Sequence, residues 1–269
     1  RLHHRHRASE ACRDRSDDAF DDCDVQGGVL VMGVLTTSPR FVLPWGTPRL
    51  LLNYKTAPDV APPWGTTAWT TPSVAAPTPG SMLIAHVTYV TNAGGDPSAP
   101  ITISDSLTHI WSEPVTQHSR LGQTADWLGH AFFEASNSST STFTVSVDTS
   151  AGDIYGWAVQ VSELTGASAA AIGATGSVSA TGDGAVNITL SAAPAATSVV
   201  VAGLGCYETT GLTFAITPGS GWNELCETGH SYPNTQTQYR TGSTSNQVDW
   251  SDNGTTVVGH LGLAFEVVR

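Results

Sequence analysis

An internal repeat constrains the fold of this 269-residue chain more than any other feature. The segment Thr71–Ala85 matches the segment Thr189–Ala202, and Ser81 aligns with Ser198. Each segment holds a proline-bearing turn followed by an apolar run. A repeat at this spacing is about one small domain long, so it predicts a duplicated unit.

Three further pairs of segments match in the same order along the chain. They are Ile110–Glu113 with Gly221–Glu224, Phe143–Asp148 with Val248–Asp252, and Trp157–Val161 with Leu261–Phe265. The offset falls from 117 residues at Ser81 and Ser198 to 104 at Trp157 and Leu261, so the second copy has shorter loops. Loops vary in length more readily than core strands do. We place the first repeat at residues 66–167 and the second at residues 168–269.

Within each copy, apolar residues alternate with polar ones. The series Phe143, Val145 and Val147 is one example, and Trp157–Val161 is another. A period of two is typical of strands with one buried face and one wet face. We therefore predict an all-β fold, an antiparallel β-sandwich or jelly-roll-like body of two tandem repeats with six or seven strands each. The pattern leaves open whether the repeats form two sandwiches or interleave into one.

The charge of the chain excludes one class of partner, and its hydropathy argues against another. The net charge is −12, and Lys55 is the only lysine, so no basic surface is expected to neutralise the phosphates of a nucleic acid. The longest apolar run, Gly27–Leu35, is about half as long as a membrane-spanning helix requires. We expect neither nucleic acid nor membrane as a partner.

The first 65 residues do not share the repeat. Residues 1–31 precede the first methionine, Met32, and show no periodic apolar pattern, which predicts a disordered or untranslated leader with translation starting at Met32. Residues 32–65 hold six prolines and two tryptophans. Because proline cannot donate to a strand ladder, we expect this segment to be an irregular Pro/Trp-rich arm rather than a set of central strands.

Three motifs carry a resemblance to a known family. They are Ile103–Trp111, Val161–Gly166 and Thr217–Leu225. Together with the apolar strand that opens each half, they resemble a duplicated β-sandwich family of tailed-phage virion and minor tail proteins, especially from phages of actinobacteria, and related bacterial surface proteins. The likeness covers roughly residues 66–269. The Gly-Asn turn of that family is replaced here by Leu107-Thr108-His109.

The resemblance implies a virion structural protein in the phage particle, as a minor tail or capsid-surface component. Such a protein acts through contacts with other virion proteins and with itself as a homo-oligomer, and needs no cofactor. A second hypothesis is a carbohydrate-binding adhesin module, extracellular or at the cell surface, that attaches to a host glycan. A third and more distant one is a sandwich-fold glycan hydrolase.

No motif of the sequence carries a recognisable catalytic site, so we predict that the chain is not an enzyme. The Gly-x-Ser-x-Gly pentapeptide of α/β-hydrolases is absent. Glu113 and Glu224 lie at matching repeat positions beside a tryptophan, which favours a turn or strand-edge role over a catalytic pair. We also assign no metal, because the spacing of the candidate ligands is not diagnostic: Asp105, His109, His118 and His130.

Aromatic residues supply the candidates for glycan binding. Eight tryptophans exceed what a sandwich core usually needs, and an exposed ring can stack on a sugar. The strand alternation assigns three of them to the core: Trp111, Trp157 and Trp222. The candidate glycan-binding residues are Trp64, Trp69, Trp127 and Trp250.

Two cysteines in the second repeat are candidates for a disulfide. Cys206 and Cys226 fall at the positions held by Tyr89 and Val115 in the first repeat. They would pair only if the protein ends up outside a reducing cytoplasm, and buried free thiols fit the sequence equally well.

Overall fold

A computed structural model describes residues 46–55, 67–91, 100–120, 127–152, 154–182, 184–208, 215–228, 233–252 and 257–268. All of them belong to one compact unit, Pro44–Arg269. Within these ranges the chain forms sixteen strands and no helix, and so contains no helix that could cross a membrane. The expected leader and most of the expected arm lie outside the described residues.

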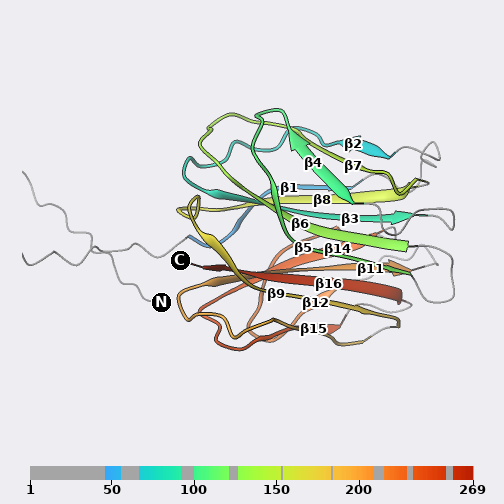
Figure 1. Cartoon of the computed structure of the whole chain (residues 1–269). Helices are drawn as coiled ribbons and strands as arrows, with labels where there is room; N and C mark the ends of the chain where they lie inside the picture. Colours follow the sequence, from blue (N-terminus) through green and yellow to red (C-terminus); the bar gives the residue numbers. More distant parts are fainter. Residues whose placement is uncertain are drawn as a thin grey trace, which may run out of the picture. The chain divides into compact units, whose positions relative to one another are not determined.

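The strands divide into two sets of eight with the same connectivity (Figure 1). The first set comprises β1 (Arg49–Lys55), β2 (Ala68–Thr70), β3 (Met82–Thr91), β4 (Ile101–Asp105), β5 (Ser112–Arg120), β6 (Trp127–Ser136), β7 (Val145–Thr149) and β8 (Ile154–Leu164). The second comprises β9 (Ala171–Ala180), β10 (Val186–Thr189), β11 (Val199–Glu208), β12 (Thr217–Pro218), β13 (Asn223–Glu227), β14 (Asn234–Thr241), β15 (Gln247–Asp252) and β16 (Val257–Val268).

Each set of eight strands forms an antiparallel sandwich. In the first, a five-stranded sheet of order β1-β8-β3-β6-β5 faces a three-stranded sheet of order β2-β7-β4. In the second, the orders are β9-β16-β11-β14-β13 and β10-β15-β12, so every strand has a counterpart eight places later. This is a jelly-roll order in which the fifth strand joins the larger sheet. The predicted all-β fold of two tandem repeats is confirmed, and the repeats form two sandwiches.

The strand count and the start of the first repeat differ from the expectation. Each half has eight strands rather than six or seven, and the first half begins at β1, inside the segment expected to be an irregular arm. Residues 49–55 contain no proline, and they pair with β8 as an edge strand. Leu51 reaches the core of the first sandwich. The prolines of residues 32–65 flank this strand without interrupting it.

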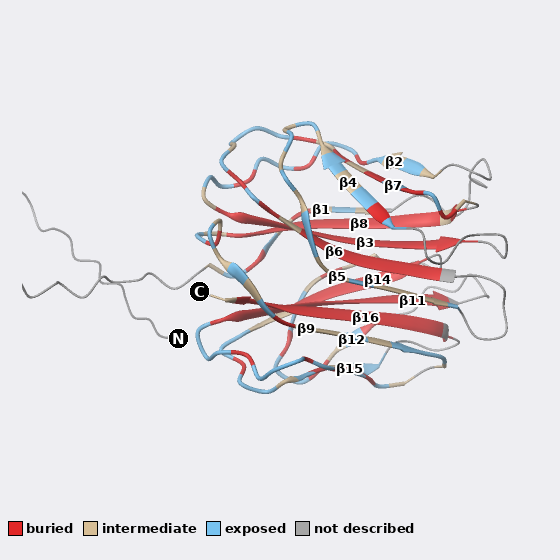
Figure 2. Ribbon diagram, viewed as in Figure 1, coloured by how far each residue is buried: buried red, intermediate tan, exposed pale blue. Residues whose placement is uncertain are grey.

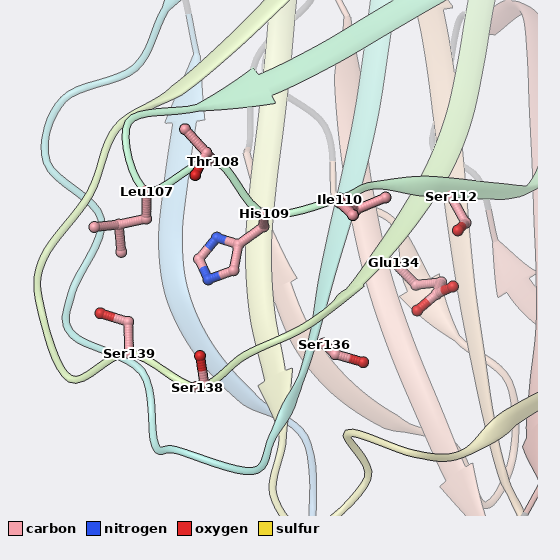
Figure 3. Close-up of a pocket in the computed structure, with 9 residues that line it drawn as sticks. All are labelled: Leu107, Thr108, His109, Ile110, Ser112, Glu134, Ser136, Ser138 and Ser139. Carbon is pink, nitrogen blue, oxygen red and sulfur yellow. The ribbon is translucent and has the colours of Figure 1, made fainter.

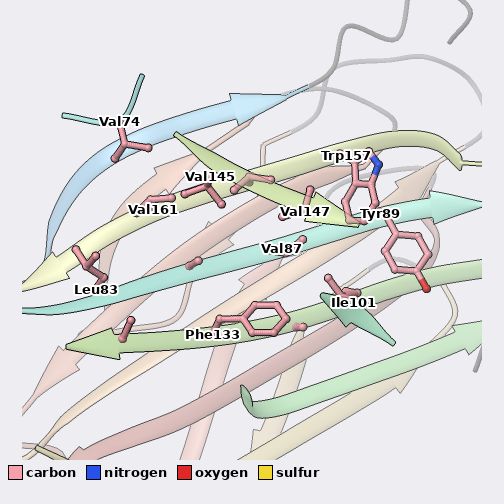
Figure 4. Close-up of a cluster of buried hydrophobic side chains, with 14 of the residues drawn as sticks. Val74, Leu83, Val87, Tyr89, Ile101, Phe133, Val145, Val147, Trp157 and Val161 are labelled. Carbon is pink, nitrogen blue, oxygen red and sulfur yellow. The ribbon is translucent and has the colours of Figure 1, made fainter. Parts of the chain in front are cut away.

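The buried residues form three layers, two within the sandwiches and one between them. Figure 2 shows the buried residues concentrated along the central strands of the two five-stranded sheets. The first sandwich is filled by a cluster that includes Leu83, Phe133, Val147 and Trp157 (Figure 4). The second is filled by a cluster around Trp250. The third layer, which we call the seam, lies between the two five-stranded sheets. Its apolar members include Met82, Ile84, Phe132, Val201, Leu263 and Phe265, with a smaller cluster of Val90, Leu128, Tyr207 and Leu261.

In the seam, larger residues of the first repeat face glycines at the matching positions of the second repeat. His86 and Thr88 of β3 correspond to Gly203 and Gly205 of β11, at the same offset of 117 residues that relates Ser81 to Ser198. A Cβ on Gly203 would lie 2.4 Å from Nε2 of His86, and one on Gly205 would lie 2.8 Å from Cγ2 of Thr88. The two sheets approach closely here because one repeat supplies side chains where the other has none.

A buried glutamate anchors the turn before the third strand of each sandwich. Glu163 accepts hydrogen bonds from the backbone N–H of Thr78 at 2.6 Å and from its hydroxyl at 3.0 Å, and pairs with Arg49 at 2.7 Å. Glu266 accepts from the backbone N–H groups of Ala195 at 2.8 Å and Ala174 at 3.1 Å. Burial alone would raise the pKa of both carboxyls, but these hydrogen bonds, with the Arg49 charge at Glu163, lower it.

The strand register corrects one detail of the repeat alignment. Tyr89 pairs with Trp157 across β3 and β8, and its counterpart Cys206 pairs with His260 across β11 and β16. The structural counterpart of Trp157 is therefore His260 rather than Leu261. A slip of one residue moves a side chain to the other face of the sheet, and Leu261 indeed packs in the seam, whereas Trp157 packs inside its sandwich.

Candidate functional site

A pocket of about 610 Å³ opens on the first sandwich, between the β4–β5 connection and the end of β6 (Figure 3). Hydroxyl groups dominate its lining, and they come from Thr108, Ser112, Ser136, Ser138 and Ser139. The remaining lining residues are Leu107, His109, Ile110 and Glu134. The described lining of the pocket thus offers many hydrogen-bonding groups, one carboxylate and no basic side chain other than an imidazole.

Asp105, at the end of β4, fixes the loop that forms one wall of the pocket. Its carboxylate accepts hydrogen bonds from the backbone N–H of Leu107 at 2.7 Å, from Nε1 of Trp111 at 2.6 Å and from Nδ1 of His109 at 3.1 Å. The Asp105 side chain is fully buried. Carboxylates favour such turns because they accept several hydrogen bonds from nearby donors. The motif Ile103–Trp111 is therefore a loop-forming device in this structure.

His109 ties this loop to the facing wall. Its Nε2 contacts Oδ1 of Asn137 at 3.1 Å, and the amide group of Asn137 donates to the carbonyls of Thr78 at 2.8 Å and Ser139 at 3.1 Å. Those two bonds orient Oδ1 toward His109, so both ring nitrogens of His109 face oxygen acceptors. Both ring nitrogens of His109 are therefore engaged, one by Asp105 and the other by Asn137.

Thr108 holds a strained backbone at the pocket. Its φ is 60°, and among the described residues it alone has a positive φ without being glycine. A β-branched residue rarely adopts this region, and strained backbone persists where the surroundings over-determine it. Leu107 and His109 on either side are both bound to Asp105. The anchored loop therefore imposes on Thr108 a conformation that Gly or Asn would adopt more readily.

Ile110 adds an exposed apolar surface to the pocket rim. Its exposed fraction is 88%, the one large hydrophobic residue so exposed among those described. It lies between His109 and Ser112 along the rim (Figure 3). An apolar contact beside hydroxyls and a carboxylate suits a ligand with both an apolar face and hydroxyl groups.

The structure removes one candidate glycan-binding residue and leaves others open. Trp250 is fully buried inside the second sandwich, and its Nε1 donates to Oε1 of Gln236 at 2.6 Å, so its ring is not available to a sugar. Trp69 is half-buried on β2 and packs against the first core. Trp127 begins β6, but its side chain lies outside the described residues, as does all of Trp64.

The cysteines do not pair, which corrects the disulfide alternative. Cys206 lies on β11 and Cys226 on β13, with β14 between them, so two strand spacings of roughly 10 Å separate the backbones. Their side chains also face opposite sides of the sheet, since Cys206 packs inside the sandwich and Cys226 contacts Oγ1 of Thr237 on the other face. Burial raises the pKa of the Cys206 thiol well above its ordinary value and that of Cys226 to about 12.

The other candidate polar residues are dispersed. Glu113 lies on β5, which packs beside β9, and Glu224 lies on β13, which packs beside β1. These strand pairs are at opposite edges of the seam, so the two glutamates cannot act as one carboxylate pair. Burial raises the pKa of both. His130 is buried in the seam, where its Nδ1 contacts the carbonyl of Leu261. In the described ranges, no three His, Cys, Asp or Glu side chains converge on a metal position.

Sequence reasoning missed two features of this region. The role of Asp105 was hidden because its partners Leu107, His109 and Trp111 look like ordinary loop residues until the loop closes. The second feature is the burial of His86, the one strongly polar residue in the apolar run of β3. Its place in that run could have identified it as a buried histidine. Comparisons with known proteins do not extend these assignments, since no family model, curated protein or solved structure matches the chain.

Replacing Thr108 with asparagine tests whether the pocket loop is strained. Asn tolerates a positive φ better than Thr, so Thr108→Asn should stabilise the protein by about 0.5–1 kcal/mol. Urea unfolding at neutral pH measures the change. Thr102→Asn, on neighbouring β4 with ordinary backbone geometry, is the matched control and should not stabilise the protein. Equal or lower stability of Thr108→Asn than of wild type would contradict the strain.

Proposed function

We propose that this chain is a structural protein of a phage virion, a minor tail or capsid-surface component, that acts through contacts with other virion proteins and with copies of itself. The observation that carries the proposal is the duplicated jelly roll with its shared seam. Jelly rolls recur in viral capsid proteins and in lectins, and the motifs named above resemble those of tailed-phage virion proteins. This support comes from fold and motif analogy.

The surface composition supports a role in protein contacts. Charged residues make up only 13% of the chain, and cores of protein interfaces are depleted in charge. The outer face of the β2-β7-β4 sheet carries hydroxyls from Thr70, Thr102, Ser104 and Ser146, and the Oγ atoms of Thr70 and Ser146 lie 2.8 Å apart. A polar but weakly charged sheet face can pack against a partner at a small desolvation cost.

Immunogold electron microscopy tests the virion proposal. Antibodies raised against residues 44–269 should label a fixed place on intact phage particles, because a structural component is retained through purification. Particles treated with antibody pre-absorbed on the purified protein are the control. Protein detected in the infected-cell lysate but absent from purified particles would contradict the proposal.

The pocket favours a second candidate function, a carbohydrate-binding adhesin. The supporting observation is the combination of five hydroxyl-bearing residues, Glu134 and exposed Ile110 around one cavity on a pre-formed loop. Pre-formed sites bind with a smaller entropic cost, and a sugar offers both hydroxyls and apolar C–H faces. Because Glu134 is a carboxylate and the described lining residues include no Lys or Arg, a neutral or amino sugar fits better than an acidic one.

Calorimetric titration with host-wall polysaccharide fragments tests this second function. Ile110→Ala and Glu134→Ala should each weaken binding about tenfold, since each removes a contact worth about 1.5 kcal/mol. Asn187→Ala, on the exposed side of β10 in the other sandwich, is the matched control and should bind like wild type. Binding unchanged in both pocket variants would remove the pocket as a glycan site.

A further inference from the structure

A group of polar side chains lies at the centre of the seam, between the two apolar clusters of the seam. His86 of β3, His130 of β6 and Gln160 of β8 are all buried there. The Nε2 atoms of the two histidines are in direct contact, and the ring of His86 stacks on Phe132 with centroids 4.7 Å apart. This group belongs neither to the pocket nor to the cores of the two sandwiches.

The outer nitrogens of both rings are committed to oxygen acceptors. Nδ1 of His86 lies 2.9 Å from Oε1 of Gln160, and Nδ1 of His130 lies 3.1 Å from the carbonyl of Leu261. The amide group of Gln160 donates to Oδ1 of Asn53 and to the carbonyl of Thr235, each at 3.3 Å, which fixes its Oε1 toward His86. Each neutral ring therefore carries its one proton on Nδ1 and directs the lone pair of Nε2 at the other ring.

This arrangement limits how many protons the pair can hold. One proton fits between the facing nitrogens, where the first ring donates it and the second accepts it. A second proton would set two N–H groups against each other with no acceptor for either, because every nitrogen of both rings would then carry a proton. The His86 ring is packed against Gly203, where even a Cβ would collide with it, so it has no room to move away from His130 within the closed seam.

The groups facing the pair offer no charge to balance a proton. From the second sandwich they are Gly203, Gly205, Thr235 and Leu261, and none of these titrates. From the first they are Thr88, Gln117, Phe132 and Gln160, also neutral. Two titratable side chains lie near. His118, on the other face of β5, would add repulsion, and Glu134 lies on the same face of β6 as His130 but four residues away, at the pocket.

We propose that the His86–His130 pair makes the seam acid-sensitive, so that the two sandwiches separate as the opened pair takes up protons from solvent. The closed seam accommodates at most one proton, whereas two solvated imidazoles bind two. Acidification therefore favours the open seam by mass action. Each sandwich keeps its own apolar core, the cluster around Val147 or the cluster around Trp250. His260, on the inner side of the second sandwich, is also buried, and desolvation lowers its pKa while a hydrogen bond with the backbone of Gly182 raises it. The variants described below keep His260, so they separate its contribution from that of the pair.

The direction of the pH effect follows from burial. Desolvation lowers the pKa of His86 from 6.5 to about 4, and desolvation together with the charge of His86 holds the pKa of His130 well below its ordinary value. The neutral pair makes its full contribution to the stability of the closed seam above pH 6.5, and this contribution is lost as the pH falls toward 4. For His86 alone, the opening equilibrium should shift by roughly 50-fold between pH ~7 and pH ~4.5.

Hydrogen exchange read by mass spectrometry, corrected for the intrinsic pH dependence of exchange, tests the proposal on the full chain. Between pH ~7 and pH ~4.5, protection should fall at least about tenfold in β3, β6, β11 and β16, while β7 and β15, away from the seam, keep theirs. The double variant His86→Gln with His130→Gln should lose this pH response. His109→Gln, a histidine outside the seam, should retain it.

Three results would overturn the proposal. They are unchanged seam protection in wild type, equal loss in β7 and β15, and a full pH response in the double variant. If the double variant does not fold, His86→Phe takes its place, because a phenyl ring can stack on Phe132 and leaves His130 a single titrating group. That variant should show a smaller response than wild type, and an equal response would contradict the paired site.

Discussion

The packing of the two five-stranded sheets against each other is the contact on which the rest of the structure depends. It buries a second face of each of these sheets, so β3 has no exposed residue along its length. Separated sandwiches would each expose an apolar face containing Phe132 or Phe265, of a size that soluble proteins rarely leave uncovered. The fit relies on Gly203 and Gly205, which leave space for His86 and Thr88. The duplicated halves are therefore complementary rather than interchangeable.

The polar groups of the molecule divide between this seam and the surface. In the seam, His86, His130 and Gln160 form a network whose hydrogen bonds suit neutral rings joined by at most one proton. At the surface, Asp105 and His109 hold a loop that presents Thr108 and Ile110 at a hydroxyl-lined pocket. The first group governs how the sandwiches hold together, and the second offers a place for a ligand.

The fold class was predictable from sequence because the repeat and the period of two survive in the strands. The extra strand β1 was missed because the prolines around residues 49–55 suggested irregular backbone, although none lies within the strand. The register error between Trp157 and Leu261 has a related cause. In strands buried on both faces, apolar residues occur on both faces, so alternation no longer shows which residue faces which layer.

The errors at individual sites have different causes. Trp250 was named as a candidate for glycan binding, but Val248 and Trp250 alternate with polar residues on β15 and point into a sandwich core, and Cys206 and Cys226 could be judged only once the sheet order was known. Calorimetric unfolding of the chain at neutral pH tests the central role of the seam most directly. The account predicts one cooperative transition for both sandwiches, with matching calorimetric and van't Hoff enthalpies, because they share a buried layer. Two separate transitions would contradict it.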